Sequence, residues 1–99
     1  MAKFILFSQE GCVPCKDLKK TLIKSAGLKV SRNPDKGDVY EVNLDIDEHG
    51  RALAMHVYRI AVTPTLIMLD DEGQEVNRSR GNMSYEDFLA FVNAGERGV

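Results

Sequence analysis

The chain has 99 residues, of which 43% are hydrophobic and 28% are charged, and its formal net charge is −2. These fractions are those of a globular protein, which argues against a fibrous or disordered chain, and the length leaves room for one small core. The slightly acidic balance argues against nucleic acid as the main partner. We therefore expect residues 1–99 to form a single domain.

The N-terminal region shows no pattern typical of a targeting or membrane segment. Its first apolar run, Phe4 to Phe7, is shorter than the apolar region of a signal peptide and far too short to cross a bilayer. We expect a cytoplasmic protein, while a processed precursor stays open. In a reducing cytoplasm two cysteines seldom form a permanent disulfide, which favours metal binding or catalysis.

The first half of the chain predicts a strand, a helix, a loop and a second strand. Residues 3–8, KFILFS, are apolar between polar neighbours and predict a buried strand. The spacing is helical from about Val13 to Gly27, and four side chains are expected to face the core: Leu18, Leu22, Ile23 and Ala26. Turn formers from Ser31 to Asp38 predict a surface loop. Residues 39–44, VYEVNL, predict the second strand.

The second half predicts a helix, a hairpin and a last helix. Asp47 is expected to cap a helix to about Arg59, with Leu53, Val57 and Ile60 facing inward. PTLIML from Pro64 predicts a strand buried on both faces, and DDEG at 70–73 predicts a hairpin turn into the strand QEVNRS. Ser84 and Asp87 predict the capped start of the last helix. Met83 is expected to pack on Phe88, and the helix to bury Phe88, Leu89 and Val92.

The predicted order is therefore β-α-β-α-β-β-α. A parallel βαβ unit followed by an antiparallel hairpin fits one mixed sheet. We expect an α/β fold with a four-stranded sheet that is flanked by helices on both faces.

Cys12 and Cys15 are the only cysteines, and they lie where the first predicted strand gives way to the first helix. Unpaired N–H groups and the dipole at a helix start favour an anion, here the Cys12 thiolate. Because thiolates attack disulfides, we expect Cys12 to be the nucleophile and the less exposed Cys15 to resolve the mixed disulfide. Pro14 suits the first helical turn and stiffens the loop.

Two other uses of the pair stay open, a zinc site and an inert buried pair. The pair supplies half of a zinc ligand set, and His49 and His56 lie outside the usual finger spacing. Free thiols are also common as small core residues. We favour a redox dithiol, because C-x-x-C beside a βαβ pattern is typical of one, and we expect neither a metal nor a cofactor.

Five motifs follow one another along nearly the whole chain: CVPCK, EVNLDID, YRIAVTPTLIML, DDEGQEV and RGNMSYEDFLAFV. In this order they resemble the thioredoxin and glutaredoxin superfamily, and in particular small thioredoxin-like proteins of phages and bacteria. The chain is similar to the minimal core of that fold. The resemblance implies a thiol–disulfide oxidoreductase of electron transport that reduces protein disulfides.

The resemblance also implies a substrate groove beside the cysteines. The Thr63–Pro64 bond would be cis, and the Thr63 backbone would pair with an extended substrate segment. Gly81 would let a partner approach closely, and Val13 would lie at the same groove. Taken alone, Pro64 also fits a strand-opening proline and Gly81 a turn glycine.

Several positions depart from the thioredoxin pattern. Leu6 replaces a usual buried acid, Ser8 and Gly11 replace tryptophans, and Glu41 replaces a lysine. We hypothesise that Glu41 exchanges a proton with Cys15, because burial beside the cysteines would favour a carboxyl able to hold that proton. The alternative is a solvent-facing strand carboxylate.

The reductant and the clients follow only from the resemblance. A flavoprotein thioredoxin reductase is the expected reductant, and glutathione is the lesser option because no double glycine follows Pro64. The clients would be disulfide-containing proteins, with ribonucleotide reductase among those suggested. The basic residues Lys16, Lys19 and Lys20 would attract an anionic partner or form a solvated helix face. We expect a monomer without membrane contact.

Two alternative functions stay open. One is a glutathione-coupled glutaredoxin, and the other is a thioredoxin-fold binding or accessory subunit with dispensable cysteines.

Overall fold

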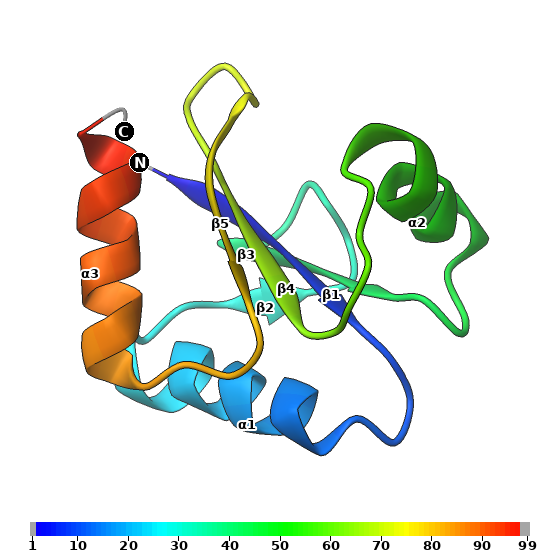
Figure 1. Ribbon diagram of the computed structural model, residues 1–99, viewed down its shortest axis with the longest axis horizontal. Coiled ribbons are helices and arrows are strands. Elements are labelled where there is room, and N and C mark those ends of the chain that lie inside the picture. The colour runs from blue at the N-terminus through cyan, green and yellow to red at the C-terminus, as the bar shows by residue number, and fades with distance from the viewer. Residues whose placement is uncertain (1, 98–99) are drawn as a thin grey trace.

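The computed structural model describes residues 2–97, and its strands form one mixed sheet in the order β2-β3-β1-β4-β5 (Figure 1). The central strand β1 pairs in parallel with β3 and antiparallel with β4. At the edges, β2 pairs in parallel with β3, and β5 pairs antiparallel with β4. The strands are β1 Lys3–Ser8, β2 Val30–Ser31, β3 Val39–Asn43, β4 Thr65–Leu69 and β5 Glu75–Arg80.

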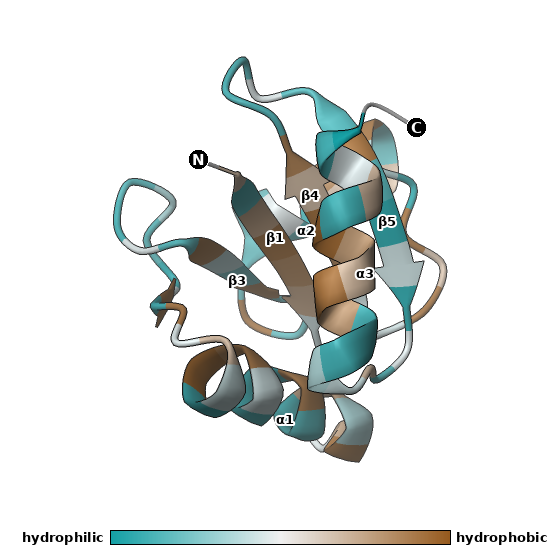
Figure 2. Cartoon of the chain, turned by 90° about the vertical axis from the view of Figure 1, so that its left-hand side faces the viewer, coloured by the Kyte–Doolittle hydropathy of each residue, from teal (hydrophilic) through white to brown (hydrophobic). Residues whose placement is uncertain are grey.

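Helices cover both faces of this sheet. α1 and α3 lie on one face and α2 lies on the other, as the two views of the ribbon show (Figures 1 and 2). Their bounds are α1 Val13–Lys20, α2 Glu48–Ala52 and α3 Tyr85–Glu96, and π-helical turns at Thr21–Ser25 and Leu53–Val57 continue α1 and α2. The expected α/β fold with helices on both faces is confirmed.

The expected four-stranded sheet is wrong in one respect, because β2 adds a fifth strand at the edge beside β3. Val30 pairs with Val39, and Ser31 pairs with Tyr40. Ser31 was expected to begin the surface loop. A strand of two half-buried residues is too short to show an alternating apolar pattern.

The core is divided between the two faces of the sheet by the alternation of side chains along each strand. On β1, Phe4 and Leu6 pack with α1 and α3, whereas Ile5 and Phe7 pack with the α2 side. All four are buried because both faces are covered, which explains why the strand is apolar throughout.

Three side chains that were expected to face inward are exposed: Ile23, Val57 and Leu89. Ile23 and Val57 lie in the π-helical turns, where the bond runs from residue i to i+5 and the 3.6-residue periodicity no longer holds. Ala54 is buried in place of Val57. In α3, Phe88 and Phe91 form the buried stripe, and Leu89 lies outside it.

The helix starts agree with the predicted caps. The Asp47 side chain accepts the Gly50 N–H at 2.8 Å, and Ser84 and Asp87 form a reciprocal capping box. The Tyr40 hydroxyl also donates to Asp47, at 3.4 Å. Burial, and then the neighbouring Asp47 carboxylate, raises the pKa of Tyr40 above its usual value.

We predict that Leu18→Ala lowers the free energy of unfolding by about 2–5 kcal/mol, because it leaves a cavity at a fully buried position of α1. Leu89→Ala is the matched control, since this helical leucine is 45% exposed. It should change stability by less than about 0.5 kcal/mol. Urea unfolding followed by circular dichroism measures both, and equal losses would contradict this account of the core.

Candidate functional site at the start of the first helix

The cysteine pair lies where β1 has ended and α1 begins. Cys12 occupies the N-cap position of α1, and a disulfide joins it to Cys15 in the first turn, with 5.2 Å between the Cα atoms. The Cys15 N–H donates to Cys12 Sγ at 3.2 Å. The sulfur of Cys12 therefore occupies the place of a capping oxygen, where the helix favours negative charge.

The two sulfurs differ in exposure. Cys15 is only 4% exposed, whereas Cys12 is half-buried. Val13 and Pro14 follow Cys12 on the exposed side of the first turn, with 64% of Val13 accessible. An incoming partner therefore reaches Cys12 and Val13 before it reaches Cys15.

Of the residues expected at the groove, Thr63 lies beside Cys12, and Gly81 is bonded to the residue that follows Thr63. The Thr63–Pro64 peptide bond is cis, and Thr63 Oγ1 lies 4.0 Å from Cys12 Sγ. The Gly81 N–H donates to the Pro64 carbonyl at 2.8 Å. Gly81 has a φ of +86°, and the space that a side chain would occupy there is open.

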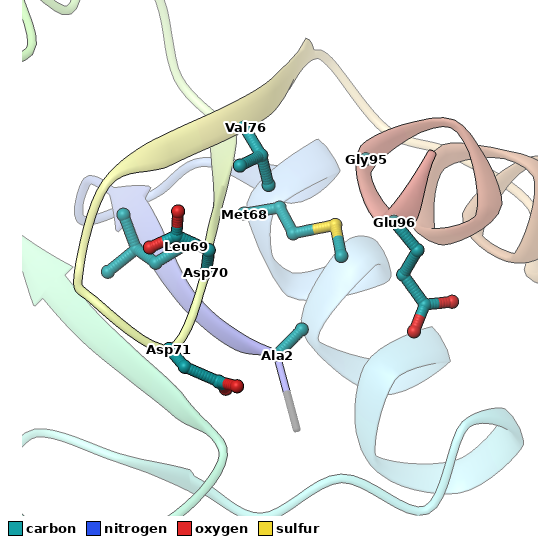
Figure 3. A pocket seen from close by; sticks show the side chains of 8 residues that line it. All are labelled: Ala2, Met68, Leu69, Asp70, Asp71, Val76, Gly95 and Glu96. Atoms are coloured by element: carbon teal, nitrogen blue, oxygen red, sulfur yellow. The ribbon is translucent and has the colours of Figure 1, made fainter. Parts of the chain in front are cut away.

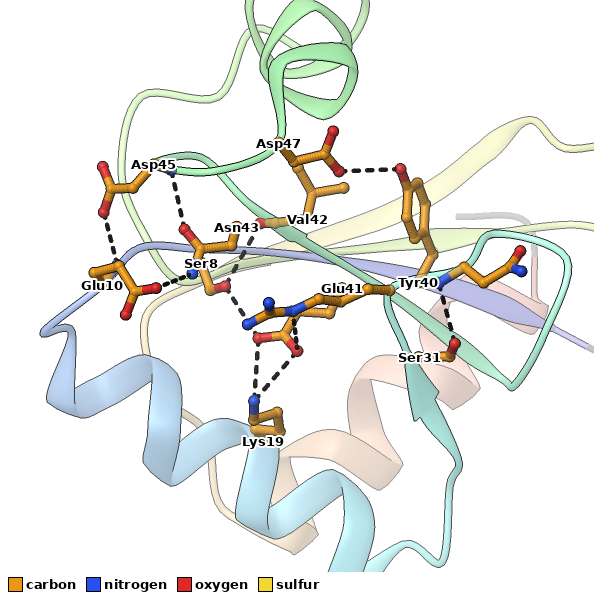
Figure 4. Close-up of polar contacts among 12 residues, drawn as sticks. Ser8, Glu10, Lys19, Ser31, Tyr40, Glu41, Val42, Asn43, Asp45 and Asp47 are labelled. Carbon is orange, nitrogen blue, oxygen red and sulfur yellow. Dashed lines mark hydrogen bonds and ion pairs between the residues drawn. The ribbon is translucent and has the colours of Figure 1, made fainter.

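Glu41 lies on β3 in register with Leu6 and faces α1. It is 7% exposed, so it is not a solvent-facing carboxylate. Ser8 Oγ donates to Glu41 at 3.2 Å, and Lys19 Nζ lies 3.2 Å from both carboxylate oxygens (Figure 4). Arg32 Nε lies 3.9 Å from the same carboxylate. One hydroxyl and two cations therefore fix the position of the Glu41 carboxylate.

Cys15 and Glu41 line the same small cavity of about 80 Å³. That volume accommodates water, and polar groups surround it. Lys19 follows Cys15 by one helical turn and lines the cavity as well. The remaining lining residues are Ser8, Gln9, Glu10, Gly11, Lys16, Arg32 and Asn43.

A second set of hydrogen bonds holds the loop before Cys12 to the end of β3. The Glu10 N–H donates to Asp45 Oδ2 at 2.8 Å, and Asn43 Nδ2 donates to Glu10 Oε1 at 3.2 Å. The Asp45 N–H in turn donates to Asn43 Oδ1 at 3.0 Å (Figure 4). We call Glu10, Asn43 and Asp45 the loop clamp.

Sequence reasoning did not identify the loop clamp or the partners of Glu41. The position of Lys19 near the cysteine pair could have been predicted, because Lys19 lies four residues after Cys15 and so on the same helix face. The position of Arg32 could not have been predicted, since it lies in an irregular loop that only the fold brings back to β3.

A larger pocket, of about 340 Å³, lies beside the start of β1, and neither cysteine lines it. Its lining includes Met68 and three carboxylates, Asp70, Asp71 and Glu96 (Figure 3). Between residues 2 and 97, no three His, Cys, Asp or Glu side chains are grouped to hold a metal ion. Within that same range, no helix is both long and apolar enough to span a membrane.

Solved structures share this fold. A thioredoxin-fold protein from Helicobacter pylori is 23% identical, with a TM-score of 0.69 over 90% of this chain and 65% of the other. Malassezia sympodialis thioredoxin is 22% identical, with a TM-score of 0.64 over 95% and 75% of the two chains. Thioredoxin-2 of a malaria parasite is 20% identical, with a TM-score of 0.67 over 94% and 82%. At these identities the likeness concerns the fold alone.

Sequence comparison identifies the family. No curated protein sequence matches the chain significantly. The family model of the thioredoxin-like domain, however, matches residues 2–96, which include the cysteine pair, the cis proline and all the helices and strands. The chain therefore belongs to the thioredoxin-like domain family.

Proposed function

We propose that the protein is a thiol–disulfide oxidoreductase that reduces disulfide bonds in client proteins. One observation carries this proposal, the Cys12–Cys15 disulfide at the start of α1, with its more accessible sulfur beside Thr63. We further propose that it works as a single-domain monomer in a reducing cytoplasm, where a dithiol is the resting form.

In the first step the Cys12 thiolate attacks one sulfur of the client disulfide. A mixed disulfide forms, and the other client sulfur leaves as a thiolate that takes up a proton. The Cys15 thiolate then attacks Cys12 Sγ, which closes the Cys12–Cys15 disulfide and releases the second client thiol. The client gains two electrons and two protons, and the protein loses them.

The surroundings of the two cysteines support this division of roles. The N-cap position and the Cys15 N–H favour a thiolate on Cys12. Cys15 is enclosed, so a large client reacts with Cys12 and not with Cys15. Cys15 then reacts only with Cys12, inside the protein. Lys16 extends the exposed side of the first turn and adds positive charge near the pair.

Glu41 is the proposed proton partner of Cys15. Before it attacks, Cys15 has to lose its proton, and the shared cavity provides room for water between the thiol and the carboxylate. Lys19 and Arg32 hold the Glu41 carboxylate in place beside this cavity.

The groove beside Cys12 is the proposed client site. An extended client segment would pair with the backbone of Thr63, as an added strand does. Gly81 presents open space beside Pro64, so that a client backbone can approach closely. Val13 would supply an apolar contact next to the reacting sulfur.

Thioredoxin reductase is the proposed reductant, with glutathione as the lesser option, and ribonucleotide reductase is one client that the family resemblance suggests. The alternative function is a binding or accessory subunit that uses the same groove while its cysteines are dispensable. The exposed Val13 beside that groove would serve both functions equally.

We predict that the wild-type protein reduces insulin with dithiothreitol as reductant and that Cys12→Ser abolishes this turnover, because the variant lacks the attacking sulfur. Insulin precipitation measures the rate. Asp17→Asn, an exposed substitution in the same helix, is the control that retains both sulfurs. A folded wild-type protein without turnover would contradict the proposal and favour the binding subunit.

We predict that Glu41→Gln slows turnover at neutral pH roughly tenfold or more, because an amide cannot accept the Cys15 proton. The rate should recover as the pH rises and hydroxide removes that proton. Glu72→Gln, in the exposed turn before β5, is the matched control. If Glu41→Gln and wild type have the same pH–rate profile while both remain folded, Glu41 has no part in proton transfer.

We predict that thioredoxin reductase with NADPH recharges the oxidised protein faster than glutathione with glutathione reductase does. The sequence lacks the double glycine that the glutaredoxin resemblance would require. NADPH consumption with each reductant in turn compares the two rates. Faster recharging by glutathione would assign the protein to the glutaredoxin alternative.

A further inference from the structure

The hydroxyl of Thr63 lies between two acceptors that differ in chemistry. It donates to Gln9 Oε1 at 2.8 Å, and Cys12 Sγ lies 4.0 Å from the same oxygen. A hydroxyl has one proton, so only one of the two acceptors receives it at a time. The structure contains the disulfide, and in this state the shorter contact is the one to Gln9.

Reduction changes the balance between these two acceptors. In the disulfide, Cys12 Sγ is a neutral and weak acceptor, whereas the Gln9 amide oxygen is a good one. In the dithiol form, Cys12 carries a negative charge when it ionises, and hydrogen bonds to an ionised acceptor are about twice as strong as neutral ones. A hydroxyl proton rotates to suit its surroundings, so the exchange needs no movement of the backbone.

We propose that the Thr63 hydroxyl shifts its hydrogen bond from Gln9 to Cys12 Sγ when the disulfide is reduced, and so stabilises the attacking thiolate. Thr63 then acts on the reacting atom through its side chain, in addition to any contact of its backbone with a client. Gln9 is a positioning residue, because it holds the hydroxyl in place while Cys12 is oxidised. The inference rests on the proposed role of Cys12 as the nucleophile.

The three groups are held in place from separate parts of the fold. Thr63 precedes Pro64, which is fully buried and bonded through its carbonyl to the Gly81 N–H. Gln9 adjoins Glu10, which the loop clamp ties to the end of β3. Both sides are therefore anchored beside Cys12, and rotation of the Thr63 and Cys12 side chains is enough to shorten the 4.0 Å separation when the disulfide opens.

Other groups also act on the cysteine pair and have to be held constant in a test. The Cys15 N–H donates to Cys12 Sγ at 3.2 Å. The charged side chains that line the neighbouring cavity come from the loop, α1, β3 and the segment after β2: Glu10, Lys16, Lys19, Glu41 and Arg32. Substitutions at Thr63 and Gln9 leave all of them unchanged.

The test compares Thr63→Val with Thr63→Ser in the reduced protein. Valine keeps the branched shape and removes the hydroxyl, whereas serine keeps the hydroxyl. Iodoacetamide alkylation of Cys12 is followed by mass spectrometry as a function of pH. We expect Thr63→Val to slow alkylation roughly three- to tenfold on the acidic side of the profile, with little change at the alkaline plateau, and Thr63→Ser to follow wild type.

A second measurement uses the equilibrium with glutathione. Thr63→Val should shift it toward the disulfide, because the thiolate loses a donor. Gln9→Leu keeps the hydroxyl and removes its acceptor in the oxidised state, so it should shift the equilibrium toward the dithiol by about twofold. Loss of packing alone would not produce opposite shifts at two residues in contact.

The proposal is overturned if Thr63→Val and wild type have the same alkylation profile, or if Thr63→Ser is as slow as Thr63→Val. If Thr63→Val does not fold, the equilibrium of Gln9→Leu with glutathione is the deciding measurement. A shift of that equilibrium toward the dithiol supports the proposal, and no shift overturns it. Insulin turnover by the wild type tests the proposed function separately. A slower Thr63→Val alkylation beside an inactive wild type would refute that function and leave this inference standing.

Discussion

The burial of β1 on both faces is the constraint from which the site follows. β1 lies in the middle of the sheet, between β3 and β4, and its side chains alternate between two covered faces. A strand held in this way leaves the sheet at one fixed point, and the loop clamp fixes the path of the next residues. Cys12 therefore reaches the N-cap of α1, where the first turn offers its N–H groups to a sulfur anion.

The same alternation explains why a charged residue lies beneath the cysteine pair. Glu41 is in register with Leu6 and shares its face, so it points toward α1, on the side of the sheet that elsewhere holds an apolar core. A buried carboxylate needs partners, and here a serine, a lysine and an arginine from three other segments supply them. The ion pairs are only partly buried, because the Lys19 and Arg32 side chains are 36% and 57% exposed, so these pairs add little to stability.

Much of the fold could be predicted from local patterns. Each of these patterns depends on a few adjacent residues. Examples are the apolar runs of the strands, the helix cap formed by Ser84 with Asp87, and the position of Cys12 before a helix. The two-residue β2 and the π-helical turns could not be predicted, because short pairing and a changed helical period are set by the surrounding packing. For the site, the cysteines and Glu41 stood out by type. Gln9, Arg32 and the loop clamp did not, since ordinary polar residues gain their roles only when distant segments meet.

The central claim is that Cys12 attacks a client disulfide and Cys15 resolves the product. It is tested most directly with Cys15→Ser, in which the second step is blocked. After incubation with a disulfide-containing protein such as insulin, mass spectrometry under non-reducing conditions should find a client chain joined to Cys12. The double variant with Cys12→Ser should carry none. Absence of the adduct in a folded Cys15→Ser protein, or an equal amount in the double variant, would contradict the account.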